Sequence, residues 1–173
     1  MNRLKSVKIS PPLAALLLAI GLFLLGGILR PGFVSYDQAI NIVRLAAFLG
    51  IIAAGQTLVI LSGNAGIDLS VGAVVTLGAI LVFRYVDGQN SRVIPALGLA
   101  LAVGSGIGLV NGLGITFVGI PPLVMTLGMA GVVQGLILVV TQGEMIGDPA
   151  PIMSTLISEP LIFDIPGVVI IWV

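Results

Sequence analysis

Long apolar runs without charged residues, separated by short polar stretches, are the main pattern of this sequence. Residues 9–29, 45–67 and 93–143 contain no Asp, Glu, Lys or Arg. A helix that crosses about 30 Å of hydrocarbon needs about 20 apolar residues, so each of the first two runs predicts one membrane-spanning helix. The third run is long enough for two helices. Residues 119–122 predict the turn between them, because proline ends one helix and suits the first turn of the next.

Two shorter apolar runs complete the pattern. Residues 69–83 are too few to cross comfortably unless Arg84 and Tyr85 extend to the membrane surface, and the alternative is a re-entrant segment. Residues 165–173 begin a further run, which is either a truncated span or a short interfacial helix. We therefore predict an all-α, polytopic helical membrane protein with about five transmembrane helices plus a truncated sixth. We expect a single transmembrane domain over residues 1–173, as the N-terminal part of a chain roughly twice as long.

Composition supports a membrane protein and narrows its chemistry. The chain is 58% hydrophobic and 8% charged, whereas soluble domains carry about 25% charged residues. Its formal net charge of +0 provides no basic surface for nucleic acid. The sequence has no Cys and no His, so thiolate metal sites and the commonest general base are missing. We expect no catalytic residues, no metal and no cofactor bound by the chain itself.

The distribution of Lys and Arg leaves the topology open. The N-terminal tail has three basic residues and is predicted to be cytoplasmic. If every apolar segment crosses, Arg30, Arg44, Arg84 and Arg92 all lie outside. If residues 69–83 re-enter, Arg84 and Arg92 move inside and fit the positive-inside rule better, but the acidic, proline-rich loop of residues 142–164 is then cytoplasmic.

Residues 63–72 form a polar junction between two apolar runs. It contains Asn64, Asp68 and Ser70 between glycines, and Asp68 or Ser70 can accept hydrogen bonds from the free N–H groups at the start of the next helix. One interpretation is an ordinary cytoplasmic turn with an Asp68 cap. The other is a helix broken within the membrane, facing a polar substrate path. The predicted helix-break residues are Gly66, Gly72, Pro121 and Pro122.

Small residues recur every four positions in the fourth predicted span. They are Ala96, Ala100, Gly104, Gly108 and Gly112. We predict that they share one face and allow a neighbouring helix to approach closely. A large residue at Gly108 is expected to disrupt assembly.

Isolated neutral polar residues lie in or near the predicted spans: Gln56, Asn111, Thr126 and Gln134. Each can simply form a hydrogen bond between helices. As a set they can instead line a path for a neutral, hydroxyl-rich solute. We select Gln56, Asn64, Asp68, Ser70, Asn111 and Thr126 as candidate substrate-path residues.

Two motifs resemble those of sugar-type ABC-transporter permeases of the ribose, xylose, arabinose and galactoside group. They are residues 66–72, with the sequence GIDLSVG, and residues 120–128, with the sequence IPPLVMTLG, preceded by the NGLGI of residues 111–115. The resemblance covers residues 33–143. Where this family usually has Arg before a Gly-Leu pair, this chain has Gln134.

The resemblance implies a bacterial inner-membrane permease that imports a neutral sugar or polyol. Implied partners are a second permease copy (identical or paralogous), a periplasmic sugar-binding protein and a cytoplasmic ATP-binding subunit. The sequence has no G-x-x-x-x-G-K-[ST] motif, so ATP hydrolysis is expected in that separate subunit. The alternative function is a channel or secondary transporter for a small polar solute.

Overall fold

The computed structural model describes residues 10–62, 66–144, 147–158, 160–162 and 165–167. These residues divide into two compact units, with the boundary between Leu45 and Ala46. The first unit contains α1 (Pro11–Leu29) and the beginning of α2 (Tyr36–Leu61), which continues into the second unit. Both helices have the length and hydropathy of membrane spans.

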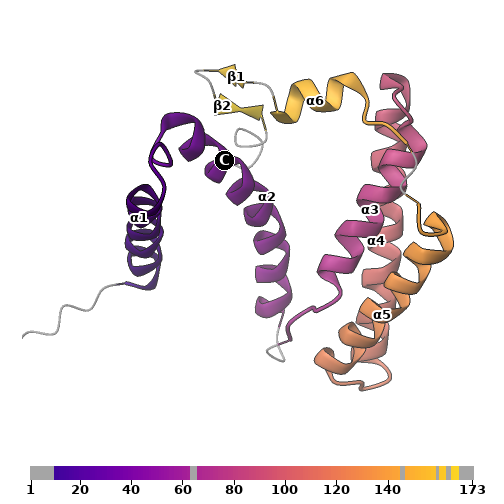
Figure 1. Ribbon diagram of the computed structural model, residues 1–173. Coiled ribbons are helices and arrows are strands. Elements are labelled where there is room, and N and C mark those ends of the chain that lie inside the picture. Colours follow the sequence, from indigo (N-terminus) through magenta and orange to yellow (C-terminus); the bar gives the residue numbers. More distant parts are fainter. Residues whose placement is uncertain (1–9, 63–65, 145–146, 159, 163–164, 168–173) are drawn as a thin grey trace, which may run out of the picture. The chain divides into compact units, whose positions relative to one another are not determined.

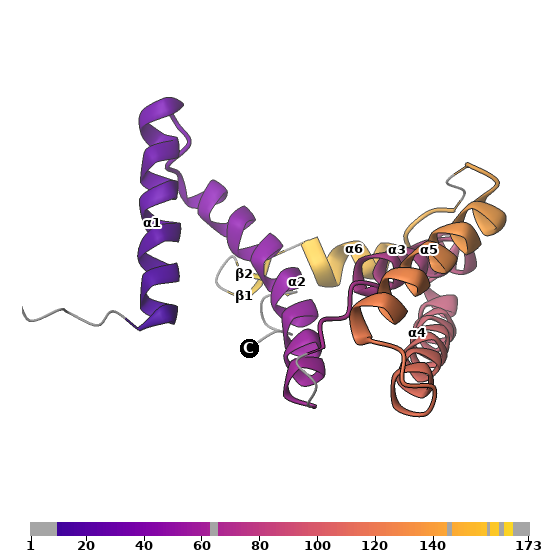
Figure 2. The ribbon, with the colours of Figure 1, turned by 90° about the horizontal axis from the view of Figure 1, so that it is seen from below.

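Three helices of the second unit pack against one another. They are α3 (Val71–Val86), α4 (Val93–Thr116) and α5 (Pro122–Thr141), with a short 3-10 turn, η1 (Asn90–Arg92), before α4. α3 contacts both α4 and α5, and α4 contacts α5, so the three lie side by side (Figures 1 and 2). The short loops make α3 antiparallel to α4 and α4 antiparallel to α5.

The helices confirm most of the predicted spans. The run of residues 93–143 divides into α4 and α5, and α5 begins at Pro122 with Pro121 as its N-cap residue. α3 extends beyond the predicted run to Val86, and it is one continuous helix that does not turn back within residues 69–83. Within the described part of the chain, four helices have the length of a span and α3 is a shorter apolar helix. The predicted sixth span falls mostly on residues 168–173, outside the described residues.

Small elements follow α5. They are α6 (Pro151–Ser158) and two short antiparallel strands, β1 (Pro160–Ile162) and β2 (Ile165–Pro166). The described residues contain no other strand. The pattern of apolar runs did not predict these strands, because two or three residues are too few to show a periodicity.

The segment before α6 is attached to the loop between α3 and α4. The Gly88 N–H donates to the Asp148 carbonyl oxygen at 2.9 Å, and the Ile152 N–H donates to Asn90 Oδ1 at 3.1 Å. Ala150 is fully buried, in one apolar cluster with residues of α3 and α4. These contacts tie the end of α3, the start of α4 and the start of α6 together.

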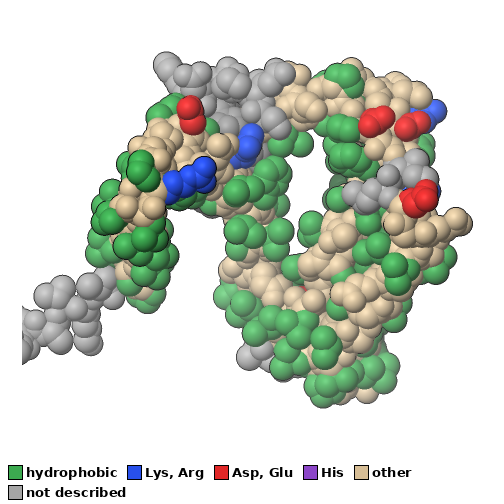
Figure 3. All heavy atoms as spheres, in the orientation of Figure 1, with side chains coloured by type: hydrophobic (Ala, Val, Ile, Leu, Met, Phe, Trp, Pro, Cys, Tyr) green, Lys and Arg blue, Asp and Glu red, His purple; other side chains and the backbone are tan. Residues whose placement is uncertain are grey.

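Charged side chains of the second unit gather at this same end. Arg84, Asp87, Arg92, Glu144 and Asp148 lie near the end of α3, the start of α4 or the end of α5 (Figure 3). The remaining surface of these helices is largely apolar, as lipid requires. Asp68 is the one other described charge of this unit, and it lies at the opposite end of α3.

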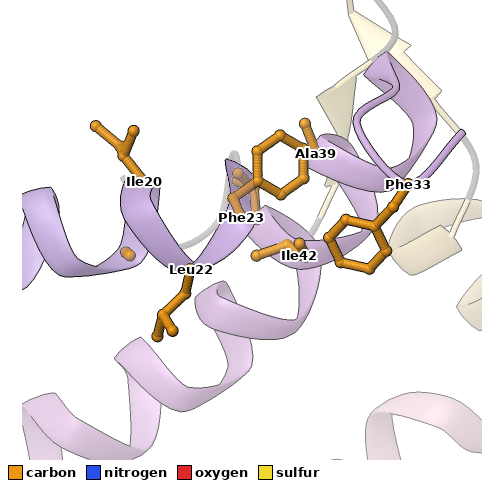
Figure 4. A pocket seen from close by; sticks show the side chains of 8 residues that line it. Ile20, Leu22, Phe23, Phe33, Ala39 and Ile42 are labelled. Carbon is orange, nitrogen blue, oxygen red and sulfur yellow. The ribbon is translucent and has the colours of Figure 1, made fainter. Parts of the chain in front are cut away.

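In the first unit, α1, Phe33 and the beginning of α2 line an open apolar pocket of about 470 Å³ (Figure 4). The Phe23 and Phe33 rings beside it have centroids 5.6 Å apart. All of the lining residues are apolar: Ala19, Ile20, Leu22, Phe23, Phe33, Ala39, Ile42 and Val43. Because the lining offers no polar side chain, this pocket is not suited to a polar solute, and the candidate site lies in the other unit.

Candidate functional site: the polar break between α2 and α3

The candidate site is the non-helical segment that leads into α3. Residues 66–70 are not helical, and Ser70 is the N-cap residue of α3. Gly66 is buried against the first residue of α5, since a Cβ there would lie 3.1 Å from the Pro122 Cβ. The glycine therefore allows the broken backbone to pass close to α5. Gly72, predicted as a break residue, lies within the first turn of α3.

Asp68 and Ser70 hold the turn before α3 together. The Ser70 N–H and the Ser70 Oγ both donate to Asp68 Oδ1, at 2.8 and 2.6 Å. Ser70 is only 1% exposed, so this carboxylate oxygen replaces water for both of its donors. Asp68 thus stabilises the residue that precedes α3 and does not bond directly to the first turn of that helix.

Asn111 of α4 and Thr126 of α5 complete the network from the neighbouring helices. Asn111 Nδ2 donates to Ser70 Oγ at 3.1 Å. Thr126 Oγ1 accepts the Leu69 N–H at 3.1 Å and donates to the Pro122 carbonyl oxygen at 2.9 Å. Both side chains are almost fully buried, 4% exposed for Asn111 and 2% for Thr126. Two neighbouring helices therefore hold the broken segment by its polar groups.

Gln56 contacts the same segment from α2. Its Nε2 donates to the Asp68 carbonyl oxygen at 3.4 Å. The structure thus brings together five of the six candidate path residues: Gln56, Asp68, Ser70, Asn111 and Thr126. The sixth, Asn64, lies outside the described residues, and Gln134 is exposed on α5.

Two buried side-chain oxygens of this network have no hydrogen-bond partner among the described residues. They are Gln56 Oε1 and Asn111 Oδ1. Each amide uses its nitrogen to donate within the network, which leaves the carbonyl oxygen as a free acceptor. Each of these two oxygens can accept a hydrogen bond from a further donor.

The polar break lies within the helix bundle, set back from the end formed by the α4–α5 turn. Asn111 precedes the last residue of α4 by five residues and Thr126 follows the first residue of α5 by four, so both lie roughly 6–8 Å from the α4–α5 turn at 1.5 Å per residue. α3 has 16 residues and α4 has 24, about 24 and 36 Å by the same rise. α3 therefore begins well short of the end that α4 reaches.

The ladder of small residues on α4 is only partly in contact with α3. Ala96 is fully buried, a Cβ on Gly78 of α3 would lie 3.9 Å from the Ala100 Cβ, and one on Gly104 would lie 3.7 Å from a valine methyl of α3. Gly108 and Gly112 are exposed, and nothing described lies within 4 Å of a Cβ built on either. Four residues exceed one helical turn by about 40°, so the ladder rotates away from α3. The packing role of Gly108 and Gly112 stays a prediction.

No pattern in the sequence singles out Asn90, Gly147 or Ala150. They form the attachment at the other end of α3, where a Cβ on Gly147 would lie 2.5 Å from a backbone oxygen of α3. Gly147 has a φ of +120°, a conformation that glycine tolerates best. The contact joins segments about 60 residues apart, and neither periodicity nor spacing indicates such a contact.

Fold and site together define a polytopic helical membrane protein with a polar break between two of its helices. The chain belongs to the family described as "branched-chain amino acid transport system / permease component", whose model matches residues 38–173. This confirms the resemblance to ABC-transporter permeases and the assignment as a transport component. No solved structure matches the chain.

Named relatives cover most of the chain. It is 36% identical over 152 residues to the autoinducer 2 import system permease protein LsrC of Yersinia enterocolitica, covering 87% of the chain and 41% of that protein. It is 38% identical over 156 residues to the inner membrane ABC transporter permease protein YjfF of Escherichia coli, covering 88% of the chain and 46% of that protein. The chain thus spans less than half the length of these relatives.

Proposed function

We propose that this chain is the transmembrane part of a permease subunit of an ABC importer, and that the solute is a neutral, hydroxyl-rich molecule such as a sugar or polyol. Membership of the permease family supports the transport role. The observation that carries the choice of solute is the polar break, where neutral side chains from α2, α4 and α5 meet around one short segment.

The chemistry of the break favours a neutral solute over an ion. Asp68 is its only carboxylate, and one of its oxygens already accepts two hydrogen bonds. The network adds no Lys or Arg that would pair with an anion. The two unpartnered carbonyl oxygens, of Gln56 and Asn111, instead suit donors such as hydroxyl groups.

The partners of the proposed importer are a second permease copy, a cytoplasmic ATP-binding subunit and a periplasmic binding protein, and ATP is bound by the separate subunit. The membrane is the bacterial inner membrane, with the N-terminus in the cytoplasm. One relative is named as an inner membrane protein and another as part of an import system.

The test is uptake by the full-length protein in proteoliposomes with its ATP-binding subunit and binding protein. We expect uptake of at least one labelled sugar or polyol among D-ribose, D-xylose, D-galactose and xylitol, with L-leucine as the comparison. Uptake should require ATP and should stop when the Walker A lysine of the ATP-binding subunit is replaced. Uptake that continues without ATP would instead support the channel or secondary transporter.

A further inference from the structure

We propose that Asn111 Oδ1 and the first N–H groups of α3 form a subsite that holds one hydroxyl group of the transported solute. This inference rests on the proposed function and names a contact within it. Asn111 is 4% exposed, and its Oδ1 has no donor among the described residues. A buried carbonyl oxygen without a donor is costly, and such groups in folded proteins usually serve a partner.

The orientation of the Asn111 amide follows from the hydrogen bonds around it. Ser70 Oγ has a single hydrogen, which it donates to Asp68 Oδ1 at 2.6 Å. Ser70 can therefore only accept from Asn111, so the atom that faces it must be the amide nitrogen. This places the acceptor oxygen, and not the NH₂ group, in the unpartnered position.

The start of α3 supplies the complementary donors. Ser70, the N-cap residue, makes no side-chain hydrogen bond to the first turn of α3, because its hydroxyl is used by Asp68. The N–H groups at the start of a helix have no partner within the helix and carry a partial positive charge. Asn111 Nδ2 contacts this N-cap residue, so the Asn111 amide and the first N–H groups of α3 lie at the same end of α3.

The register of α3 and α4 brings the start of α3 beside the end of α4. Contacts of Ser70 with Asn111, of Val74 with Gly104 and of Gly78 with Ala100 define the antiparallel register of α3 and α4. In that register the first turn of α3 lies at the level of the last turns of α4, beside the contact of Ser70 with Asn111.

A hydroxyl group fits this combination better than a carboxylate does. It donates to Asn111 Oδ1 through its hydrogen and accepts from a helix N–H through its oxygen. A carboxylate cannot donate to Asn111, and it would lie close to the negatively charged Asp68 side chain, which accepts from the Ser70 N–H just before α3. The subsite therefore selects a neutral hydroxyl.

The experiment uses the reconstituted full-length importer and fluorodeoxy analogues of whichever panel sugar it transports. Fluorine keeps the approximate size of a hydroxyl but has no hydrogen to donate. At saturating concentrations, so that the binding protein is fully loaded, we expect one fluorodeoxy analogue to be transported about three- to tenfold more slowly, the equivalent of one lost hydrogen bond. In Asn111→Leu the ratio of the two maximal rates should fall to about one.

A merely structural role of Asn111 predicts a different result. The variant would then slow the sugar and its analogue equally and leave their ratio unchanged, which would overturn the inference. Asn111→Ala gives the same test in a smaller side chain if Asn111→Leu does not assemble. Equal transport of the sugar and all its fluorodeoxy analogues by the wild-type importer would also overturn the subsite. Failure to transport any panel sugar would instead overturn the proposed function.

Discussion

Replacing Asp68 by alanine tests whether the polar break is needed for transport. The substitution removes the acceptor of two hydrogen bonds, from the Ser70 N–H and from Ser70 Oγ. The hydroxyl can rotate to another acceptor, but the N–H cannot, and Ser70 is 1% exposed. A buried donor left without an acceptor costs about 1–3 kcal/mol, which shifts the equilibrium between an intact and a disrupted break roughly 5- to 150-fold.

The assay compares uptake with membrane insertion in the full-length protein. We expect Asp68→Ala to reach the membrane at the wild-type level, by immunoblot, and to take up solute at least about fivefold more slowly. Asp68→Asn keeps an oxygen acceptor and should lose less. Asp148→Ala is the matched control, because it removes an exposed carboxylate whose side chain accepts no hydrogen bond in the described structure. Normal uptake by Asp68→Ala at normal membrane level would refute this reasoning.

Substitutions at four further positions test packing in the second unit. Thr126→Val removes the hydroxyl that accepts the Leu69 N–H and should lower stability by about 1–3 kcal/mol, measured by thermal unfolding in detergent, whereas Thr126→Ser should be nearly neutral. Gly147→Ala should lower the melting temperature, because its Cβ would lie 2.5 Å from a backbone oxygen. Gly104→Leu should destabilise the helix pair by about 1–3 kcal/mol through overpacking. Gly108→Leu has space within the chain and should affect only assembly with a second copy, measured by cross-linking.

Each of these expectations has an opposite outcome, which for Gly104→Leu is an unchanged melting temperature. Equal stability of the valine and serine variants at Thr126 would show that its hydroxyl does not hold the break. An unchanged melting temperature for Gly147→Ala would contradict the close approach to α3. If Gly108→Leu lowers the melting temperature of the monomer, Gly108 packs against another part of the same chain. If the variant assembles and transports normally, Gly108 does not lie in an interface.

The helices could be predicted from the sequence because lipid imposes a simple length rule. An uncharged run of 20 or more residues has few other stable forms in a membrane, and the turn at Pro121 and Pro122 follows from proline chemistry. The extension of α3 beyond Arg84 was harder to predict from the sequence. Arg84 donates to the carbonyl oxygen of Val140 near the end of α5, so a charged residue is accommodated in the last turn of an apolar helix.

The gathering of the candidate residues could not be derived from the sequence. Asn111 and Ser70 are 41 residues apart, and Thr126 and Leu69 are 57 apart. Their polarity within apolar surroundings indicated that each needs a partner, but only the packing of three helices decides which one. The ladder of small residues shows the same limit. Two residues four positions apart are neighbours on the helix surface, but the position of each next residue turns by about 40°, so all five residues do not face one neighbouring helix.

The unequal attachment of α3 at its two ends has a mechanical consequence. At one end, hydrogen bonds to the Asp148 carbonyl and to the Asn90 side chain join the neighbouring loops, and Gly147 packs closely against the backbone of α3. At the other, a few side-chain contacts connect a non-helical segment to α4 and α5. Bending during a transport cycle should therefore concentrate in residues 66–70, ahead of α3, while the attached end of α3 keeps its position.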